Sequence, residues 1–205
     1  MPTPIRVTKI HHACLMVDAG STRLLLDPGR LGPRPDLDGV DAVLVTHRHF
    51  DHLDPALVEE ALRRAVPVWM PGDAFGDLGD PGGPAGDDTL HEAVAGATLR
   101  IGALTVRVSG SRHAELHPTL PGPENRAYLI DERVLVTGDE HPALPGRLTA
   151  LVTPADAPWL RAADLIRTCA PCAPSSSSAS TTACSTRMGS AWPAAWSTRC
   201  GARAR

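Results

Sequence analysis

Apolar residues occur in short runs separated by Gly, Pro, Asp and Ser, and this pattern predicts a chain built mostly of short strands. Helices are expected over 55–65, which opens on the cap signal Asp54-Pro55, and from Trp159 to Ile166. Trp69 is expected in the core and His91 at the surface. The Gly-, Pro- and Asp-rich stretch 72–88 is expected to be loop. The expected strands cover residues 5–11, 12–18, 22–27, 40–45, 66–70, 98–101, 104–109, 127–130, 133–137 and 148–152.

The stretch from Thr46 to His52 reads Thr-His-Arg-His-Phe-Asp-His and directly follows the apolar strand 40–45. His47 and His49 are two residues apart, so in an extended segment they point to the same side and can bind one ion together. Asp51 and His52 follow and can turn toward a second ion. Imidazole and carboxylate groups suit zinc, and manganese or iron could also be held. The alternative is a surface loop that is rich in histidine by chance, but such an ordered pattern after a strand argues against it.

This Thr-His-x-His-x-Asp-His pattern resembles the signature of the metallo-β-lactamase superfamily of metallohydrolases. The surrounding chain is most similar to the superfamily's small bacterial lactonase-type branch, the ascorbate-6-phosphate lactonase-like group, over about residues 5 to 166. The resemblance implies an α/β fold, the four-layer αββα sandwich, with one or two metal ions at the edge between its sheets. It also implies hydrolysis by a metal-activated hydroxide. Zinc is the expected ion, with manganese possible in the lactonase-like branch.

The resemblance also assigns roles to two later residues, each of which leaves a predicted strand. His113 matches the family's third metal histidine, beside His47 and His49, and Asp139 in Gly-Asp-Glu matches the aspartate that bridges both metals. The second ion would then bind Asp51, His52 and Asp139, and either aspartate would orient the nucleophile or move a proton. The alternatives are a lone loop histidine at 113 and a turn or N-cap aspartate at 139.

Other polar residues are expected around this site. His12 lies in a Gly-His-Ala-like segment in which this chain has His11 in place of Gly, and it is expected to support a ligand rather than bind metal. Asp27, before Pro28, either holds a ligand histidine or simply starts the turn. Three residues are candidates for substrate binding: His117, Asn125 and Arg126.

The composition changes after Ile166, because residues 167–205 contain no Val, Ile, Leu, Phe, Tyr, Asp or Glu. We therefore divide the chain into a hydrolase domain, 1–166, and a low-complexity tail, 167–205, expected to be disordered. A Cys-x-x-Cys element at Cys169 and Cys172 is one alternative. The favoured hypothesis is a helix that is genuine up to Arg167, followed by translation in the wrong frame of GC-rich coding DNA. No histidine follows His141, so the family's last metal histidine lacks a counterpart. We expect a sandwich incomplete at its C-terminal end and a weakened second metal site.

Overall composition narrows the class of function. The chain has 205 residues, which suits one well-cored domain, and no long apolar run or basic-then-apolar start, so we expect a cytoplasmic location without membrane contact. Its odd number of cysteines, five, argues against a disulfide framework. All 23 acidic residues but only 15 of the 20 basic residues precede residue 167, so the body is acidic and nucleic-acid binding is not expected. The sequence leaves the oligomeric state open.

The prediction is a metal-dependent hydrolase that cleaves a lactone, ester or amide-type bond of a small molecule. One alternative keeps the metal site and acts on a phosphodiester, which Arg112, Arg126 and His117 near the pocket would favour. The other is a catalytically impaired chain that binds metal without turnover.

Overall fold

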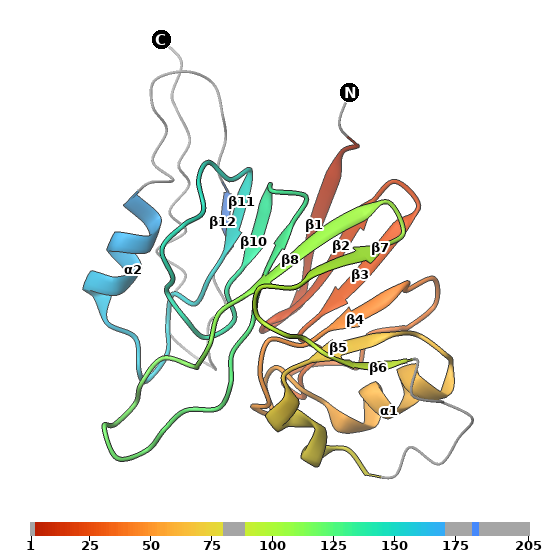
Figure 1. Cartoon of the computed structure of the whole chain (residues 1–205), viewed down its shortest axis with the longest axis horizontal. Helices are drawn as coiled ribbons and strands as arrows, with labels where there is room; N and C mark the ends of the chain where they lie inside the picture. The colour runs from red at the N-terminus through yellow and green to blue at the C-terminus, as the bar shows by residue number, and fades with distance from the viewer. Residues whose placement is uncertain (1–2, 80–88, 171–181, 185–205) are drawn as a thin grey trace.

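The computed structural model describes residues 3–79, 89–170 and 182–184, the last of these as backbone. In this part of the chain the strands form two six-stranded sheets that face each other (Figure 1). The first sheet has the order β1 (Ile5–His11), β2 (Cys14–Ala19), β3 (Thr22–Leu26), β4 (Ala42–Leu44), β5 (Val68–Met70) and β6 (Leu90–Glu92). The second runs β12 (Thr182–Cys184), β11 (Ala150–Val152), β10 (Val134–Val136), β9 (Ala127–Ile130), β8 (Leu104–Ser109) and β7 (Thr98–Ile101).

The pairing changes from antiparallel to parallel within each sheet. Strands β1 to β3 are antiparallel neighbours, and β3 to β6 are parallel. Strands β7 to β10 are antiparallel, and β10 to β12 are parallel. Because β3 and β4 are parallel, the segments that follow both strands leave at the same edge of the first sheet.

The main core lies between the two sheets. Alternate residues of each strand point into it, as the period of two requires. Tyr128 and Ile130 of β9 are fully buried there, whereas Leu129 faces the other side of the sheet. The Tyr128 hydroxyl donates a hydrogen bond to the Val45 carbonyl oxygen at 2.8 Å, which joins the second sheet to the end of β4. Desolvation raises the Tyr128 pKa well above its ordinary value, so the hydroxyl keeps the proton that it donates.

Helices cover the outer faces of the sheets. Helix α1 (Pro55–Arg63) begins at Asp54, whose carboxylate accepts a hydrogen bond from the Ala56 amide at 3.2 Å. Its apolar face packs on the outer side of the first sheet through Leu57, Val58, Ala61 and Leu62. A 3-10 helix, η1 (Gly72–Asp77), follows β5. Helix α2 (Ala162–Cys169) lies on the outer side of the second sheet (Figure 1). The layers are therefore those of the predicted αββα sandwich.

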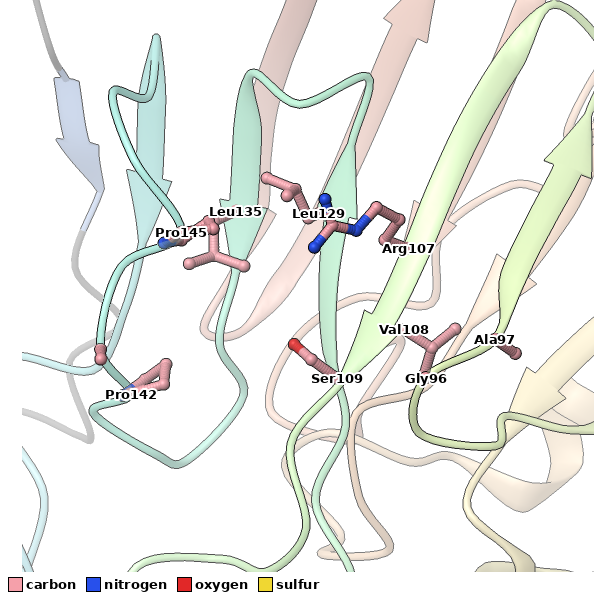
Figure 2. A pocket seen from close by; sticks show the side chains of 10 residues that line it. Gly96, Ala97, Arg107, Val108, Ser109, Leu129, Leu135, Pro142 and Pro145 are labelled. Carbon is pink, nitrogen blue, oxygen red and sulfur yellow. The ribbon is translucent and has the colours of Figure 1, made fainter.

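A pocket of about 320 Å³ opens on the outer face of the second sheet (Figure 2). Outward-facing side chains of β8, β9 and β10 form its floor, and the loop that contains Pro142 and Pro145 forms one wall. None of the predicted site residues lines this pocket. Among the described helices, none is long and apolar enough to cross a membrane.

The structure corrects several sequence-based expectations. His91 lies in β6, a strand that was not predicted, and its ring stacks on Trp69 with centroids 4.7 Å apart, so it is partly buried rather than exposed. Helix α2 starts later than Trp159 and continues past Ile166 to Cys169. Within the tail predicted to be disordered, Thr182–Cys184 forms β12 beside β11. Residues 171–181 and 185–205 lie outside the described residues.

Candidate metal centre

The predicted ligands converge at one edge between the two sheets. The segment 46–52 leaves β4, and Asp27 leaves the neighbouring parallel strand β3, with its amide bonded to the Leu44 carbonyl at 3.0 Å. From the second sheet, His113 follows β8 and Asp139 follows β10. The Arg126 amide donates to the Thr46 carbonyl at 2.8 Å, so the chain that enters β9 is tied to the segment after β4. Both sheets therefore contribute side chains to the site.

The first cluster contains His47, His49, His113 and Asp139, whose ligand-type atoms all lie within 4.8 Å of one another. His113 Nε2 is 3.2 Å from Asp139 Oδ2, and His47 Nε2 is 3.9 Å from the same oxygen. His47 is fully buried, and its Nε2 has no hydrogen-bond partner among the described residues. An unpaired buried polar atom is costly, and a cation bound at this point would satisfy it. The donor set therefore fits a divalent metal ion.

The second cluster contains His12, Asp51 and His52, again with ligand-type atoms within 4.8 Å of one another. His12 Nε2 lies 3.0 Å from Asp51 Oδ2, and His52 Nε2 lies 3.7 Å from that oxygen. His52 Nε2 is also 3.3 Å from Asp139 Oδ1. Asp139 thus turns one oxygen toward each cluster, which is the arrangement that a bridging carboxylate needs.

Asp27 and Thr46 hold the ligand histidines from behind. Asp27 accepts hydrogen bonds from the Thr46 amide at 2.7 Å, from the Thr46 hydroxyl at 2.9 Å and from His52 Nδ1 at 2.9 Å. This contact places the proton of His52 on Nδ1 and leaves Nε2 to face the cluster. Of the two interpretations of Asp27, the structure contains the one in which it holds a histidine. The role of Thr46 was missed, although this residue opens the motif.

Two glycines allow the loops of the site to pack closely. A Cβ atom at Gly29 would lie 1.9 Å from the Asp51 carbonyl oxygen. Gly138 has φ +60°, and its Cβ would lie 2.3 Å from Asn125 Oδ1 and 2.7 Å from Thr46 Cβ. Because L side chains avoid this φ and the space is filled, glycine is required immediately before Asp139.

Burial and neighbouring charges shift the pKa values of His47, His49 and Asp139 in directions that favour metal binding. Desolvation, followed by the positive charge of His52, lowers the pKa of His47 well below its usual value. Desolvation and His113 lower the pKa of His49. Both imidazoles are therefore neutral, the form that binds metal. Desolvation opposes ionisation of Asp139, but contacts with His113 and His52 outweigh it and hold its pKa well below the usual range.

Two further members of the clusters, His52 and Asp51, each have a shifted pKa and lie close to oppositely charged groups. Desolvation opposes the charge of His52, yet Asp27 and Asp139 raise its pKa well above the ordinary value. For Asp51, desolvation is again opposed, here by the His12 hydrogen bond and by His52, and the net pKa is lowered. In the metal-free protein His52 is therefore an imidazolium, and an ion that binds at its Nε2 must displace a proton.

The structure gives Asn125 and Arg126 roles that differ from the predicted contact with substrate. Asn125 is fully buried, and its amide donates to the Thr137 carbonyl at 2.8 Å while its Oδ1 accepts from the Asp139 amide at 3.0 Å. Buried Arg126 donates from Nε to the Ala93 carbonyl at 2.6 Å, and its other nitrogens bond to further protein groups. The polar atoms of both side chains are thus hydrogen-bonded to other protein groups, and Asn125 positions the loop that carries Asp139.

Two further residues were predicted, His117 as a substrate contact and Trp159 at the start of a helix. His117 is exposed, and its Nδ1 accepts a hydrogen bond from the Thr119 amide at 3.2 Å, so its contact with substrate stays a prediction. Trp159, expected at the start of a helix, instead lies before α2 with its ring edge-on to His113 at 5.4 Å between centroids. His113 Nδ1 bonds to the Ala114 carbonyl at 2.6 Å, which directs Nε2 toward the cluster. The sequence carries no signal for the contact with Trp159.

Two facing sheets flanked by helices, with His and Asp clusters at one edge between them, define the metallo-β-lactamase fold. A family model described as the beta-lactamase superfamily domain matches residues 6–174, which extends past the boundary predicted at 166. The chain belongs to this superfamily.

Individual relatives agree with the assignment. The chain is 34% identical over 180 residues to Protein Rv0786c of Mycobacterium tuberculosis, covering 82% of this chain and 80% of that protein. It is 31% identical over 140 residues to the UPF0173 metal-dependent hydrolase MJ1163 of Methanocaldococcus jannaschii, covering 65% and 60% of the two chains. The predicted class of enzyme matches the name that this homologue and others carry.

Solved structures share the fold. The metallo-beta-lactamase fold protein YhfI from Bacillus subtilis superposes with a TM-score of 0.54 at 18% identity, covering 75% of this chain and 72% of that one. CmlA from Streptomyces venezuelae, a diiron beta-hydroxylase, superposes with a TM-score of 0.51 at 19% identity, covering 74% of this chain and 34% of that one. At these identities the likeness establishes the fold, and the reaction has to be inferred from the site.

Proposed function

We propose that the chain hydrolyses a lactone, ester or amide-type bond of a small molecule with one or two divalent ions, zinc or manganese, held at the two clusters. The observation that carries the proposal is the buried Nε2 of His47, which has no hydrogen-bond partner among the described residues and lies close to two further imidazoles and a carboxylate. His47, His49 and His113 would hold the first ion, and Asp51 and His52 the second. Asp139, between them, would contact both.

An ion bound there would supply Lewis-acid polarisation of a carbonyl oxygen and would lower the pKa of a bound water toward 7. The protein contributes the position of the reacting groups. The lowered pKa values of Asp51 and Asp139 keep both carboxylates ionised, the form in which either could orient an attacking water by accepting a hydrogen bond from it. His49 is partly exposed while His47 is fully buried, so substrate would approach from the side of His49.

The carbonyl substrate is preferred to a phosphodiester. The phosphodiester alternative relied on Arg112, Arg126 and His117 as ligands for an anion. The guanidinium of Arg126 is buried and bonded to protein groups, which removes one of these three. We propose a small-molecule substrate, and the acidic body of the chain supports the absence of a nucleic-acid partner.

The test combines metal analysis with a panel of substrates. Purified protein loaded with zinc or manganese would be assayed with model lactones, p-nitrophenyl esters, an anilide and bis-p-nitrophenyl phosphate. We expect bound metal and turnover of a carbonyl substrate, and in His49→Ala the loss of turnover and of the ion at the first cluster. His91→Ala, a histidine outside both clusters, should behave as the wild type. Wild-type protein that binds no metal would refute the proposal, turnover of the phosphodiester alone would replace it, and metal without turnover of any substrate would identify an impaired chain.

A further inference from the structure

The turn between β1 and β2 places His12 at the metal centre. His12 has φ +34°, in the left-handed region that few residues other than glycine adopt, and the register of β1 against β2 shifts between Lys9 and His11. Left-handed backbone at a residue with a side chain is unfavourable and is concentrated at functional sites. Here the His12 ring lies against the carboxylate of Asp51.

The ring of His12 faces the same point as two predicted ligands. Its Nε2 is 3.0 Å from Asp51 Oδ2, and the same oxygen is 3.7 Å from His52 Nε2. The rings of His12 and His52 meet edge-on with centroids 6.2 Å apart. Both histidines therefore present Nε2 to the same carboxylate oxygen of Asp51.

The donors around this point form a set of four. Nδ1 of His52 is bonded to Asp27 at 2.9 Å, so its Nε2 is the atom left for a ligand bond. Asp139 Oδ1 is 3.3 Å from that Nε2. With His12 the groups are two imidazoles and two carboxylates, which are ligand types that zinc binds, and zinc in proteins is usually four-coordinate, with three of the four ligands from the protein in catalytic sites.

We propose that His12 Nε2 is a ligand of the second metal ion, together with Asp51, His52 and Oδ1 of Asp139. The inference rests on the proposed metal-dependent function and departs from the expectation that His12 merely supports a ligand. It gives the second site a histidine from the β1–β2 turn, so this site is complete within the described residues.

The test must separate a ligand from a residue that only orients Asp51. His12→Gln places an amide NH₂ near the position of Nε2, so it can still donate to Asp51, but it offers no imidazole lone pair. His12→Ala removes both functions. His91→Ala is the matched control for loss of a histidine, and His49→Ala reports on the first site. Zinc stoichiometry would be measured by elemental analysis after equilibrium dialysis, and the number of histidine ligands by X-ray absorption spectroscopy.

We expect two ions in the wild type and in His91→Ala, and one in both His12→Gln and His12→Ala, with affinity for the second ion reduced by more than the roughly 10- to 100-fold typical of an orienting partner. If His12→Ala does not fold, as judged by circular dichroism, His12→Gln carries the test. Two tightly bound ions in His12→Gln would overturn the inference. The inference would also be overturned if the wild type binds a single ion, His49→Ala loses that ion and His12→Gln keeps it. The proposed function would then still stand. No ion in the wild type would refute both.

Discussion

Asp27→Asn is the substitution that most sharply tests how the protein prepares His52 for metal binding. The side chain keeps its shape and loses a charge. Asp27 Oδ1 accepts from the Thr46 amide at 2.7 Å, and an amide oxygen can replace it there. The new NH₂ group then takes the place of Oδ2, which faces the Thr46 hydroxyl at 2.9 Å and His52 Nδ1 at 2.9 Å.

This exchange should invert the tautomer of His52. An amide that donates to Nδ1 leaves the ring proton on Nε2, the atom that faces Asp51 and Asp139, and a protonated Nε2 cannot bind an ion. Loss of such an orienting partner typically reduces metal affinity by about 10- to 100-fold. We therefore expect the second ion to bind about 1.4–2.7 kcal/mol more weakly.

The assay is competition with a chelating dye for zinc, which resolves the two binding steps. Asp38→Asn removes the same charge from an exposed carboxylate that contacts Arg64, so it controls for the change in net charge. The affinity of the first ion should change far less than that of the second. If Asp27→Asn binds the second ion as tightly as Asp38→Asn, the proposed orientation of His52 by Asp27 is incorrect.

Three further expectations follow from the same contacts. Asn125→Ala leaves two buried backbone groups unpaired, so the free energy of unfolding in urea without metal should fall by about 2–4 kcal/mol; a change below about 1 kcal/mol would contradict this role. Tyr128→Phe removes the hydroxyl that bonds to the first sheet and should cost about 1–2 kcal/mol in the same measurement, with no loss of metal, and a lost ion would be the contrary result. Because the raised pKa of His52 leaves it protonated in the metal-free protein, affinity for the second ion should increase by about tenfold per pH unit below that pKa, with a proton released in calorimetric titrations. Affinity that stays constant between pH 6 and 8, roughly the range in which histidines titrate, would contradict a protonated His52.

Much of the fold was readable from local pattern. The strands 98–101 and 104–109 agree with β7 and β8 at both ends, because alternation marks each strand and Gly102, with φ +54°, marks the turn. Strand β6 was missed because three residues with one strongly apolar side chain carry little periodicity, and pairing with β5 decides their conformation. Strand β12 was missed for a similar reason, since Thr-Ala-Cys is not an apolar run. That the rest of the tail is read in the wrong frame stays a prediction, which the coding DNA would test.

The residues of the site likewise fall into those that local spacing predicts and those whose contacts depend on the assembled fold. The spacing within His47 to His52 is local, so the sequence identified these residues and the structure brings them together. Asn125 and Arg126 could contact substrate only if their side-chain N–H groups were not already bonded within the protein. Carbonyl groups elsewhere in the chain accept hydrogen bonds from both side chains. Those partners, such as the Ala93 carbonyl 33 residues from Arg126, become apparent only when the sheets are assembled.

The candidate metal centre draws its ligand-type residues from both halves of the chain. The first sheet carries the motif histidines and Asp51, and the second carries His113 and Asp139. An ion held by both sets is consequently a cross-link between the two sheets, in addition to the apolar core. Metal loading should then slow hydrogen exchange in β9 and β10, although these strands supply no ligand themselves. Because an ion that binds only the folded chain shifts the folding equilibrium, the concentration of free ions would set the stability of the chain before any substrate is encountered.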